Sequence, residues 1–209
     1  MSNRFAIADP HFSHPGTIRF AGKHGGPLRP WGRVADKDEM PDDEMQRRVS
    51  EMDEAMVANW NRVVGPKDIV EVLGDVVMNR RYLPILGRLN GRKRLRMGNH
   101  DIFTKKWNAD YAPYFEEITA YKVMSDLILS HIPLHPESVK QRWLANVHGH
   151  LHDGQVMREI DDDSGWGPEI ARWVPDDRYL CVSVEQIDYT PISFDEVYAR
   201  IRERQARLA

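Results

Sequence analysis

The chain has 209 residues, of which 29% are charged and 41% hydrophobic, and its formal net charge at pH 7 is −3. This length and composition favour one soluble domain over residues 1–209, and the slightly acidic balance argues against tight electrostatic binding to long nucleic acids. The one cysteine, Cys181, excludes an intrachain disulfide, and no apolar run is long enough to span a membrane. We therefore expect a cytoplasmic protein with no membrane partner.

The first predicted element in the chain is a strand at residues 4–8, followed by a loop rich in glycine and proline at residues 20–40. Residues 42–63 carry an apolar side chain every three or four positions, which predicts an amphipathic helix ending before Gly65 and Pro66. A short helix is predicted at residues 80–89. Further apolar runs predict strands at residues 69–73, 94–97, 127–130 and 179–184.

The last third of the chain contains a polar, glycine-containing stretch at residues 154–178, which predicts a long loop excursion. A C-terminal helix is predicted at residues 194–208, where Ser193 and Glu196 have the spacing of a capping box. Cys181 lies in an apolar alternating run, so we expect it to be a buried and unreactive core residue. The alternation of strands and helices predicts an α/β fold.

Clusters of polar residues follow five apolar runs in the sequence. The clusters are Asp9-x-His11, Gly74-Asp75, Gly98-Asn99-His100-Asp101, His131 and Gly149-His150-Leu151-His152. Sites in α/β folds gather at strand ends, so we expect these side chains to converge. The glycines allow sharp turns and a close approach of the backbone.

The expected ligand set consists of carboxylates, imidazoles and one carboxamide, without a thiolate. Such a set suits divalent metals such as Mn²⁺, Fe²⁺, Zn²⁺ or Ni²⁺. There are too many ligands for one closed tetrahedral zinc site, whereas two ions about 3.5–4 Å apart, bridged by one carboxylate, would use them all. Each motif alone is compatible with a structural histidine or a solvated strand face, but all five in this order favour a metal centre.

These motifs, DPH, GD, GNHD, the histidine of LSH and GHLH, resemble in their order those of the calcineurin-like metallophosphoesterase superfamily. More narrowly, DPHFSH, ANWNRVVGPKDIV, LGD, LNGR, GNHD, LSHIPL and NVHGHLH resemble a small bacterial and phage branch of predicted phosphohydrolases. The resemblance covers most of the chain, although the 154–178 stretch matches nothing in it. It implies an α+β sandwich, in which two mixed β-sheets pack face to face and are flanked by helices.

The resemblance also implies how the ligands are shared between two ions. One ion would be held by Asp9, His11, Asp75 and His152. The other would be held by Asp75, Asn99, His131 and His150. His100 would face the substrate with Asp101 orienting its ring. His14 would contact the substrate phosphate or support His11, or would be a plain loop histidine, and a structural role is favoured for His148.

The expected function is metal-dependent phosphoester hydrolysis by a hydroxide that bridges two divalent ions, with Mn²⁺ favoured, on a small phosphodiester or nucleotide. A nuclease or RNA-end phosphatase is an alternative, because arginines and a lysine are dense between Arg80 and Arg96; a solvated face is the plainer explanation of that stretch. A non-catalytic metal-binding scaffold for a partner protein is an alternative of another class. Basic and aromatic residues such as Arg29 and Trp31 would contact substrate or anchor loops, and the protein would be a monomer or a dimer.

Overall fold

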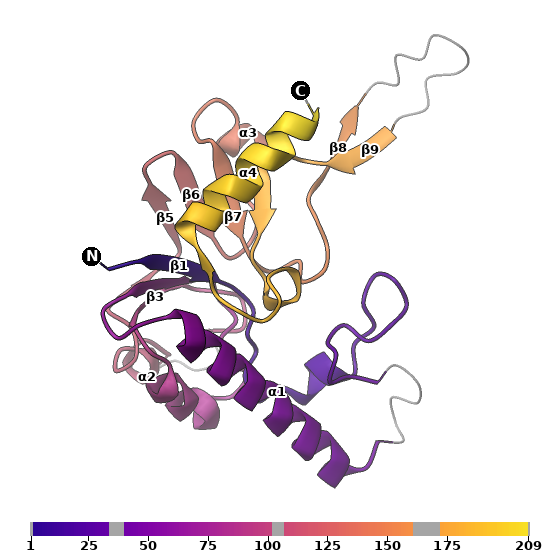
Figure 1. The fold of residues 1–209 in the computed structure, drawn as a ribbon, viewed down its shortest axis with the longest axis vertical. Coiled ribbons are helices and arrows are strands. Elements are labelled where there is room, and N and C mark those ends of the chain that lie inside the picture. Colours follow the sequence, from indigo (N-terminus) through magenta and orange to yellow (C-terminus); the bar gives the residue numbers. More distant parts are fainter. Residues whose placement is uncertain (1, 34–39, 102–106, 161–171, 209) are drawn as a thin grey trace.

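The computed structural model describes residues 2–33, 40–101, 107–160 and 172–208 (Figure 1). Two mixed β-sheets lie at its centre, with helix α4 along one side of the molecule and helix α1 along the other. This arrangement confirms the α/β sandwich of two mixed sheets flanked by helices. None of the helices in the described parts of the chain has the length and apolar character needed to cross a membrane.

The first sheet has five strands in the order β11-β1-β2-β3-β4. Their bounds are β1 Arg4–Ile7, β2 Ile69–Val72, β3 Arg92–Arg96, β4 Glu117–Thr119 and β11 Ile192–Ser193. Strands β1 to β4 are parallel, and β11 is antiparallel to β1. Ile7 pairs with Val72, and Val72 pairs with Leu95, so the carboxyl ends of these three strands meet at one edge of the sheet.

The second sheet has four strands in the order β10-β7-β6-β5. Their bounds are β5 Tyr121–Met124, β6 Leu127–Ser130, β7 Ala145–His148 and β10 Tyr179–Cys181. Strands β10, β7 and β6 are parallel, and β5 is antiparallel to β6. The first sheet thus has four parallel strands and the second has three. Parallel strands bring their carboxyl ends to one edge, which is the arrangement that gathers loop residues into a site.

The two sheets are joined immediately after β10. The strand predicted at residues 179–184 ends at Cys181, because the next residues leave the second sheet for the first. The amide of Val182 still bonds the carbonyl of His148, whereas the amide of Val184 bonds the carbonyl of Ala8. The 3₁₀ helix η3, Val184–Gln186, follows at once and lies beside the end of β1.

The predicted helix over residues 42–63 is confirmed as α1, Asp42–Val63, and its apolar stripe is buried at Val49, Met52, Met56 and Trp60. The C-terminal helix α4 spans Phe194–Leu208, and the hydroxyl of Ser193 accepts a hydrogen bond from the amide of Glu196 at 3.2 Å, as the capping box predicts. The remaining helices are short: α2 Trp107–Tyr111, α3 Pro136–Val139 and the 3₁₀ helices η1 Pro15–Ile18 and η2 Arg80–Arg88.

The stretch at residues 154–178 is not wholly a loop. Strands β8, Met157–Ile160, and β9, Arg172–Pro175, form an antiparallel pair that projects from the body of the molecule (Figure 1). Their side chains alternate between exposed and half-buried on β8, which is the pattern of a hairpin with little core beneath it. Residues 34–39 and 161–171, which complete the two predicted loop excursions, lie outside the described residues.

Candidate metal centre

The predicted site residues converge where the two sheets meet. Asp9 and His11 follow β1, Asp75 follows β2, and Asn99 follows β3 in the first sheet. His131, His150 and His152 follow β6 and β7 in the second sheet. Seven residues that span almost 150 positions of the chain are therefore brought to one edge, and six of them form two groups with the geometry of metal ligands.

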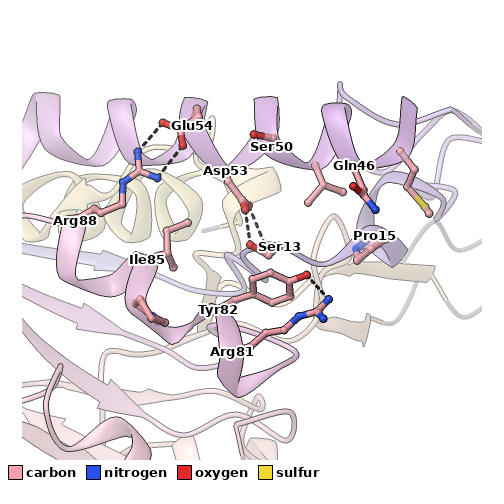
Figure 2. Close-up of a pocket in the computed structure, with 13 residues that line it drawn as sticks. Ser13, Pro15, Gln46, Ser50, Asp53, Glu54, Arg81, Tyr82, Ile85 and Arg88 are labelled. Carbon is pink, nitrogen blue, oxygen red and sulfur yellow. Dashed lines mark hydrogen bonds and ion pairs between the residues drawn. The ribbon is translucent and has the colours of Figure 1, made fainter. Parts of the chain in front are cut away.

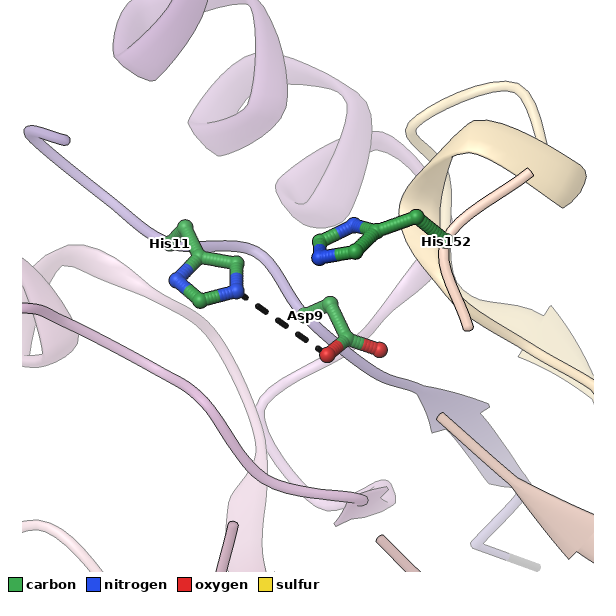
Figure 3. A group of neighbouring side chains, drawn as sticks. All are labelled: Asp9, His11 and His152. Carbon is green, nitrogen blue, oxygen red and sulfur yellow. Dashed lines mark ion pairs between the residues drawn. The ribbon is translucent and has the colours of Figure 1, made fainter. Parts of the chain in front are cut away.

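The first group consists of Asp9, His11 and His152, whose potential ligand atoms all lie within 4.8 Å of one another (Figure 3). Nε2 of His11 lies 3.9 Å from Oδ1 of Asp9, and the rings of His11 and His152 are stacked with their centroids 5.3 Å apart. The three side chains face a common point (Figure 3), as ligands of one ion must.

The second group consists of Asp75, His131 and His150. Nε2 of His131 lies 3.4 Å from Oδ2 of Asp75 and 3.0 Å from Oδ1 of Asn99, which places the carboxamide in the same group. The same Asp75 oxygen lies 3.6 Å from Nε2 of His11 in the first group. Asp75 thus stands between the two groups, in the position of a shared carboxylate.

The donor atoms fit divalent cations. Oδ1 of Asp9 is buried without a hydrogen-bond partner in the described residues, and a buried carboxylate oxygen is costly unless something positive pairs with it. Complete burial raises the pKa of Asp9 to about 6, against the charges of His131 and His152. Burial alone would lower the pKa of His131, but its hydrogen bond to Asp75 and the charges of both aspartates raise it to about 9. By contrast, burial and the charge of Arg29 hold the pKa of His11 well below its usual value. The centre thus combines an unpaired carboxylate oxygen with nearby imidazole nitrogens, a donor set that a divalent cation would fill.

The backbone at this centre is unusual. Positive φ angles, which are rare outside glycine, occur at Asp9 (54°), His11 (45°), Asp75 (54°), His150 (71°) and His152 (51°). Such conformations cost on the order of 1–2 kcal/mol each and persist where the surrounding structure imposes them, typically at functional sites. Five of the seven predicted ligands share this feature, and nothing in their residue types alone revealed it.

Gly149 permits a close approach of two ligand-bearing loops. A Cβ atom at this position would lie 2.5 Å from Oδ2 of Asp9 and 2.6 Å from Cβ of Ala8. These separations are shorter than van der Waals contact, so only glycine fits between β7 and β1 here. The predicted role of this glycine in close backbone approach agrees with the geometry.

His100 lies exposed at the rim of the centre, with its ring centroid 5.8 Å from that of His11. Its backbone amide donates a 2.9 Å hydrogen bond to Oδ1 of Asp75, which fixes the loop that carries it. His14 is half-buried, with its ring centroid 5.6 Å from that of His11. Burial and the charge of Arg29 lower its pKa to about 4. Both predicted substrate-facing histidines thus adjoin the first metal-ligand group.

Asp101 has a different position from the one expected. Its carboxylate is fully buried and accepts hydrogen bonds from the amides of Asp75, Val76 and Gly98 and from the hydroxyl of Tyr111. Both oxygens are occupied by these four donors. The expectation that Asp101 orients the His100 ring is therefore replaced by a structural role, in which Asp101 ties the loop after β3 to the loop after β2.

His148 and Cys181 are buried on β7 and β10. Nδ1 of His148 lies 2.7 Å from the carbonyl oxygen of Gly149, and its ring packs edge-on against Tyr179, in keeping with the structural role favoured for it. Cys181 is buried, and burial raises the pKa of its thiol to about 11, so it stays protonated at neutral pH. Neither side chain belongs to the two metal-ligand groups.

Three residues that support the metal ligands were not predicted from the sequence to do so. Oγ of Ser183 donates a 2.6 Å hydrogen bond to Oδ2 of Asp9, and Oε1 of Glu185 lies 3.1 Å from Nδ1 of His152. The fully buried guanidinium of Arg29 donates to the same Glu185 oxygen at 2.8 Å. Burial would raise the pKa of Glu185, but the charge of Arg29 and the bond to His152 hold it below its usual value. No local pattern marks these contacts, since Arg29 and Glu185 are 156 positions apart.

A cleft of about 770 Å³ opens beside the loop that follows His11 (Figure 2). It lies between α1 and η2, and Ser13 and Asp53 meet at its floor, where the Ser13 amide and hydroxyl donate to the Asp53 carboxylate at 2.9 and 2.6 Å. The Tyr82 ring borders the cleft with Arg81 against it, the guanidinium carbon 4.5 Å from the ring centroid.

The arginine-rich stretch between Arg80 and Arg96 is largely paired with acids. Salt bridges join Arg80 to Asp110, Arg88 to Glu54, Arg92 to Glu116, Arg94 to Glu71 and Glu116, and Arg96 to Glu71 and Glu117. This supports the plainer explanation of the stretch. Trp31, in the 20–33 loop, packs edge-on against Tyr189 at 4.9 Å, as a loop anchor does.

No family model matches this chain. It is 28% identical over 208 residues to the Uncharacterized protein MJ1445 of Methanocaldococcus jannaschii, covering 97% of this chain and 93% of that protein. It is also 28% identical over 141 residues to the Gene 66 protein of Mycobacterium phage L5, covering 52% of this chain and 68% of that protein. The crystal structure of the protein of unknown function AQ665 from Aquifex aeolicus has a similar fold, with a TM-score of 0.59 and 24% identity over 95% of this chain and 99% of that one. The likeness to the Aquifex aeolicus structure supports the fold, and none of the three names states an activity.

Proposed function

We propose that the protein is a metal-dependent phosphoester hydrolase of the calcineurin-like metallophosphoesterase type. The observation that carries the proposal is the pair of Asp/His groups at converging strand ends, with Asp75 within 3.6 Å of a histidine nitrogen from each. A shared carboxylate between two groups of nitrogen and oxygen ligands is the arrangement of binuclear hydrolytic centres.

In this proposal, one ion is bound by the first group and Asp75, and the other by the second group and Asn99. Two such ions, when bound, would supply a water of lowered pKa and would neutralise charge on the phosphoryl oxygens. Ser183, the amide of His150 and the amide of His100 already hold the two aspartates in place. These hydrogen bonds fix the orientation of both carboxylates.

His100 is the residue that we assign to the substrate. Its ring is exposed at the rim and is not needed as a ligand by either group. As an imidazolium it would bind a phosphoryl oxygen or protonate the leaving group, a contribution typically of about 10²–10⁴ in rate. His14, whose ring centroid lies 5.6 Å from that of His11, would contact the same phosphate.

We propose a small phosphodiester or nucleotide as substrate. The cleft between α1 and η2 adjoins the loop after His11, and none of the seven predicted metal ligands lines it. Its volume, about 770 Å³, is in the range of small-molecule sites, and its lining combines the Tyr82 ring with polar groups such as Ser50 and Gln46. A nuclease or RNA-end phosphatase is less well supported, because most of the arginines between Arg80 and Arg96 are already paired with carboxylates.

The test is a metal-dependent activity screen. Chelated protein should be inactive on chromogenic phosphodiesters, phosphomonoesters and nucleotides, and Mn²⁺ should restore activity, with elemental analysis showing two ions per chain. Binding of two ions without activity on any ester would favour the non-catalytic scaffold. Full activity of the chelated, metal-free protein would refute the proposal.

A further inference from the structure

The segment from Ser183 to Gln186 contacts the first metal-ligand group through three side chains. Besides the bonds of Ser183 to Asp9 and of Glu185 to His152, Nε2 of Gln186 donates to the carbonyl oxygen of His152 at 2.7 Å. The segment follows β10 at the point where the chain passes from one sheet to the other. It therefore supports ligands from both sheets at once.

Arg29 holds the other side of this arrangement. Its side chain is completely buried, and all three guanidinium nitrogens donate hydrogen bonds: Nε to Oε1 of Glu185 at 2.8 Å, Nη2 to the carbonyl of Asp9 at 2.8 Å and Nη1 to the carbonyl of Pro10 at 2.9 Å. The turn that it holds is the one in which Asp9 and His11 have positive φ angles. A lysine could not make these three bonds, because its single ammonium lacks the planar fork.

We propose that Arg29 and Glu185 are positioning residues for the ion bound by Asp9, His11 and His152. When Nδ1–H of His152 is donated to Glu185, the lone pair of Nε2 is left to face the ion, and a carboxylate partner makes that nitrogen a stronger donor. His131, in the second group, has instead a backbone carbonyl as partner, with Nδ1 2.8 Å from the oxygen of Leu73. The two ion sites therefore depend on different supports.

This inference rests on the proposed binuclear centre, and its test measures metal binding rather than turnover. In Glu185→Gln, one amide oxygen can still accept from both Arg29 and His152, because the single oxygen Oε1 accepts both bonds in the wild type. The substitution removes the charge and places an amide NH2 group where Oε2 of Glu185 is buried without a hydrogen-bond partner in the described residues. Loss of such a partner typically lowers metal affinity by about 10–100-fold.

We expect calorimetric titration with Mn²⁺ to show two ions bound by the wild type. In Glu185→Gln we expect one site weakened about 10–100-fold and the other unchanged. At Mn²⁺ concentrations that fill only the stronger site of Glu185→Gln, its electron paramagnetic resonance spectrum should be that of an isolated Mn²⁺ ion. The spectrum of the wild type should be that of an exchange-coupled Mn²⁺ pair. Arg29→Lys retains the charge and should weaken the same site. If circular dichroism shows that Glu185→Gln is unfolded, Arg29→Lys is the variant that tests the inference.

Glu71→Gln is the matched control, because Glu71 is also fully buried and pairs with a buried arginine, Arg96, away from the metal-ligand groups. It should lower thermal stability and leave both Mn²⁺ affinities unchanged. Wild-type isotherms for folded Glu185→Gln or Arg29→Lys, or an equal loss of Mn²⁺ in Glu71→Gln, would overturn the inference. Failure of the wild-type protein itself to bind Mn²⁺ would instead refute the proposed function.

Discussion

Replacing Gly149 by alanine tests whether the fold holds the two ligand loops at contact distance. The added methyl group would lie 2.5 Å from Oδ2 of Asp9, 2.6 Å from Cβ of Ala8 and 3.0 Å from the carbonyl oxygen of Leu73. Two of these three atoms belong to the backbone or to a Cβ, which cannot move without shifting β1 or β2. The loop bearing His150 must therefore move away from Asp9.

The magnitude follows from the cost of overpacking. Forcing an extra methyl into a closely packed site typically costs about 1–3 kcal/mol. At roughly 2–4 °C per kcal/mol for a domain of this size, the melting temperature should fall by about 2–12 °C. Because the methyl also displaces the oxygen that the His150 amide bonds at 2.8 Å, we expect Mn²⁺ affinity to fall as well, by about 10–100-fold.

The assay is differential scanning calorimetry of the chelated protein, followed by Mn²⁺ titration. Gly26→Ala is the control, since a Cβ at Gly26 has no neighbour within 4 Å and its φ is not in the left-handed region. It should leave melting temperature and Mn²⁺ binding unchanged. If Gly149→Ala has the same melting temperature and the same Mn²⁺ affinity as the wild type, the two loops are not held at contact distance and the reasoning is wrong.

Four further predictions follow from the site. Asp75→Asn should abolish binding of both ions, measured by elemental analysis, because the anion between the groups becomes a neutral amide. His100→Ala should retain both ions and lose about 10²–10⁴ in turnover on esters with poor leaving groups, and loss of an ion would contradict its assigned role. Tyr111→Phe should reduce the free energy of unfolding by about 1.5–3 kcal/mol in urea titrations, because it removes a 2.9 Å bond to the buried Asp101 carboxylate. Affinity for single-stranded RNA should be low and should be the same in Arg81→Ala. If the wild type binds RNA with an affinity that falls steeply with salt, and Arg81→Ala loses this binding, the nuclease hypothesis would be favoured instead.

The ligand set could be anticipated from the sequence because each ligand follows a short apolar run. Parallel strands bring such positions to one edge whatever the details of packing, so Asp9, Asp75 and the histidines after β6 and β7 meet as expected. The long helix α1 was likewise evident, since its apolar stripe repeats over the whole element. In both cases the signal is a pattern within one segment.

The support around the ligands could not be anticipated in the same way. Arg29 lies in a loop whose composition gives no sign of burial, and its partner Glu185 follows a strand that the sequence predicted to continue. The contact between them depends on where the chain passes from one sheet to the other. The role expected for Asp101 came from the resemblance, and the hydrogen bonds that replace it join Asp101 to residues of the loop after β2, about 25 positions away in sequence.

The two aspartates divide their oxygens between the fold and the ions. Oδ2 of Asp9 accepts from the amide of His150 and from Ser183, while its Oδ1 has no hydrogen-bond partner in the described residues. Oδ1 of Asp75 accepts from the amide of His100, while its Oδ2 faces His11 and His131. Each carboxylate thus ties a neighbouring ligand loop in place with one oxygen and offers the other to the centre.

This division explains how the strained turns persist before any ion binds. Positive φ angles costing on the order of 1–2 kcal/mol each are offset by hydrogen bonds to charged groups worth about 1.5–3 kcal/mol each. The division of the oxygens also decides whether asparagine or alanine is the more informative replacement for either aspartate. Asparagine can keep the oxygen that holds the neighbouring loop and loses only the negative charge facing the ions. Alanine removes both, so a loss of metal in an alanine variant would not distinguish a missing ligand from a displaced loop.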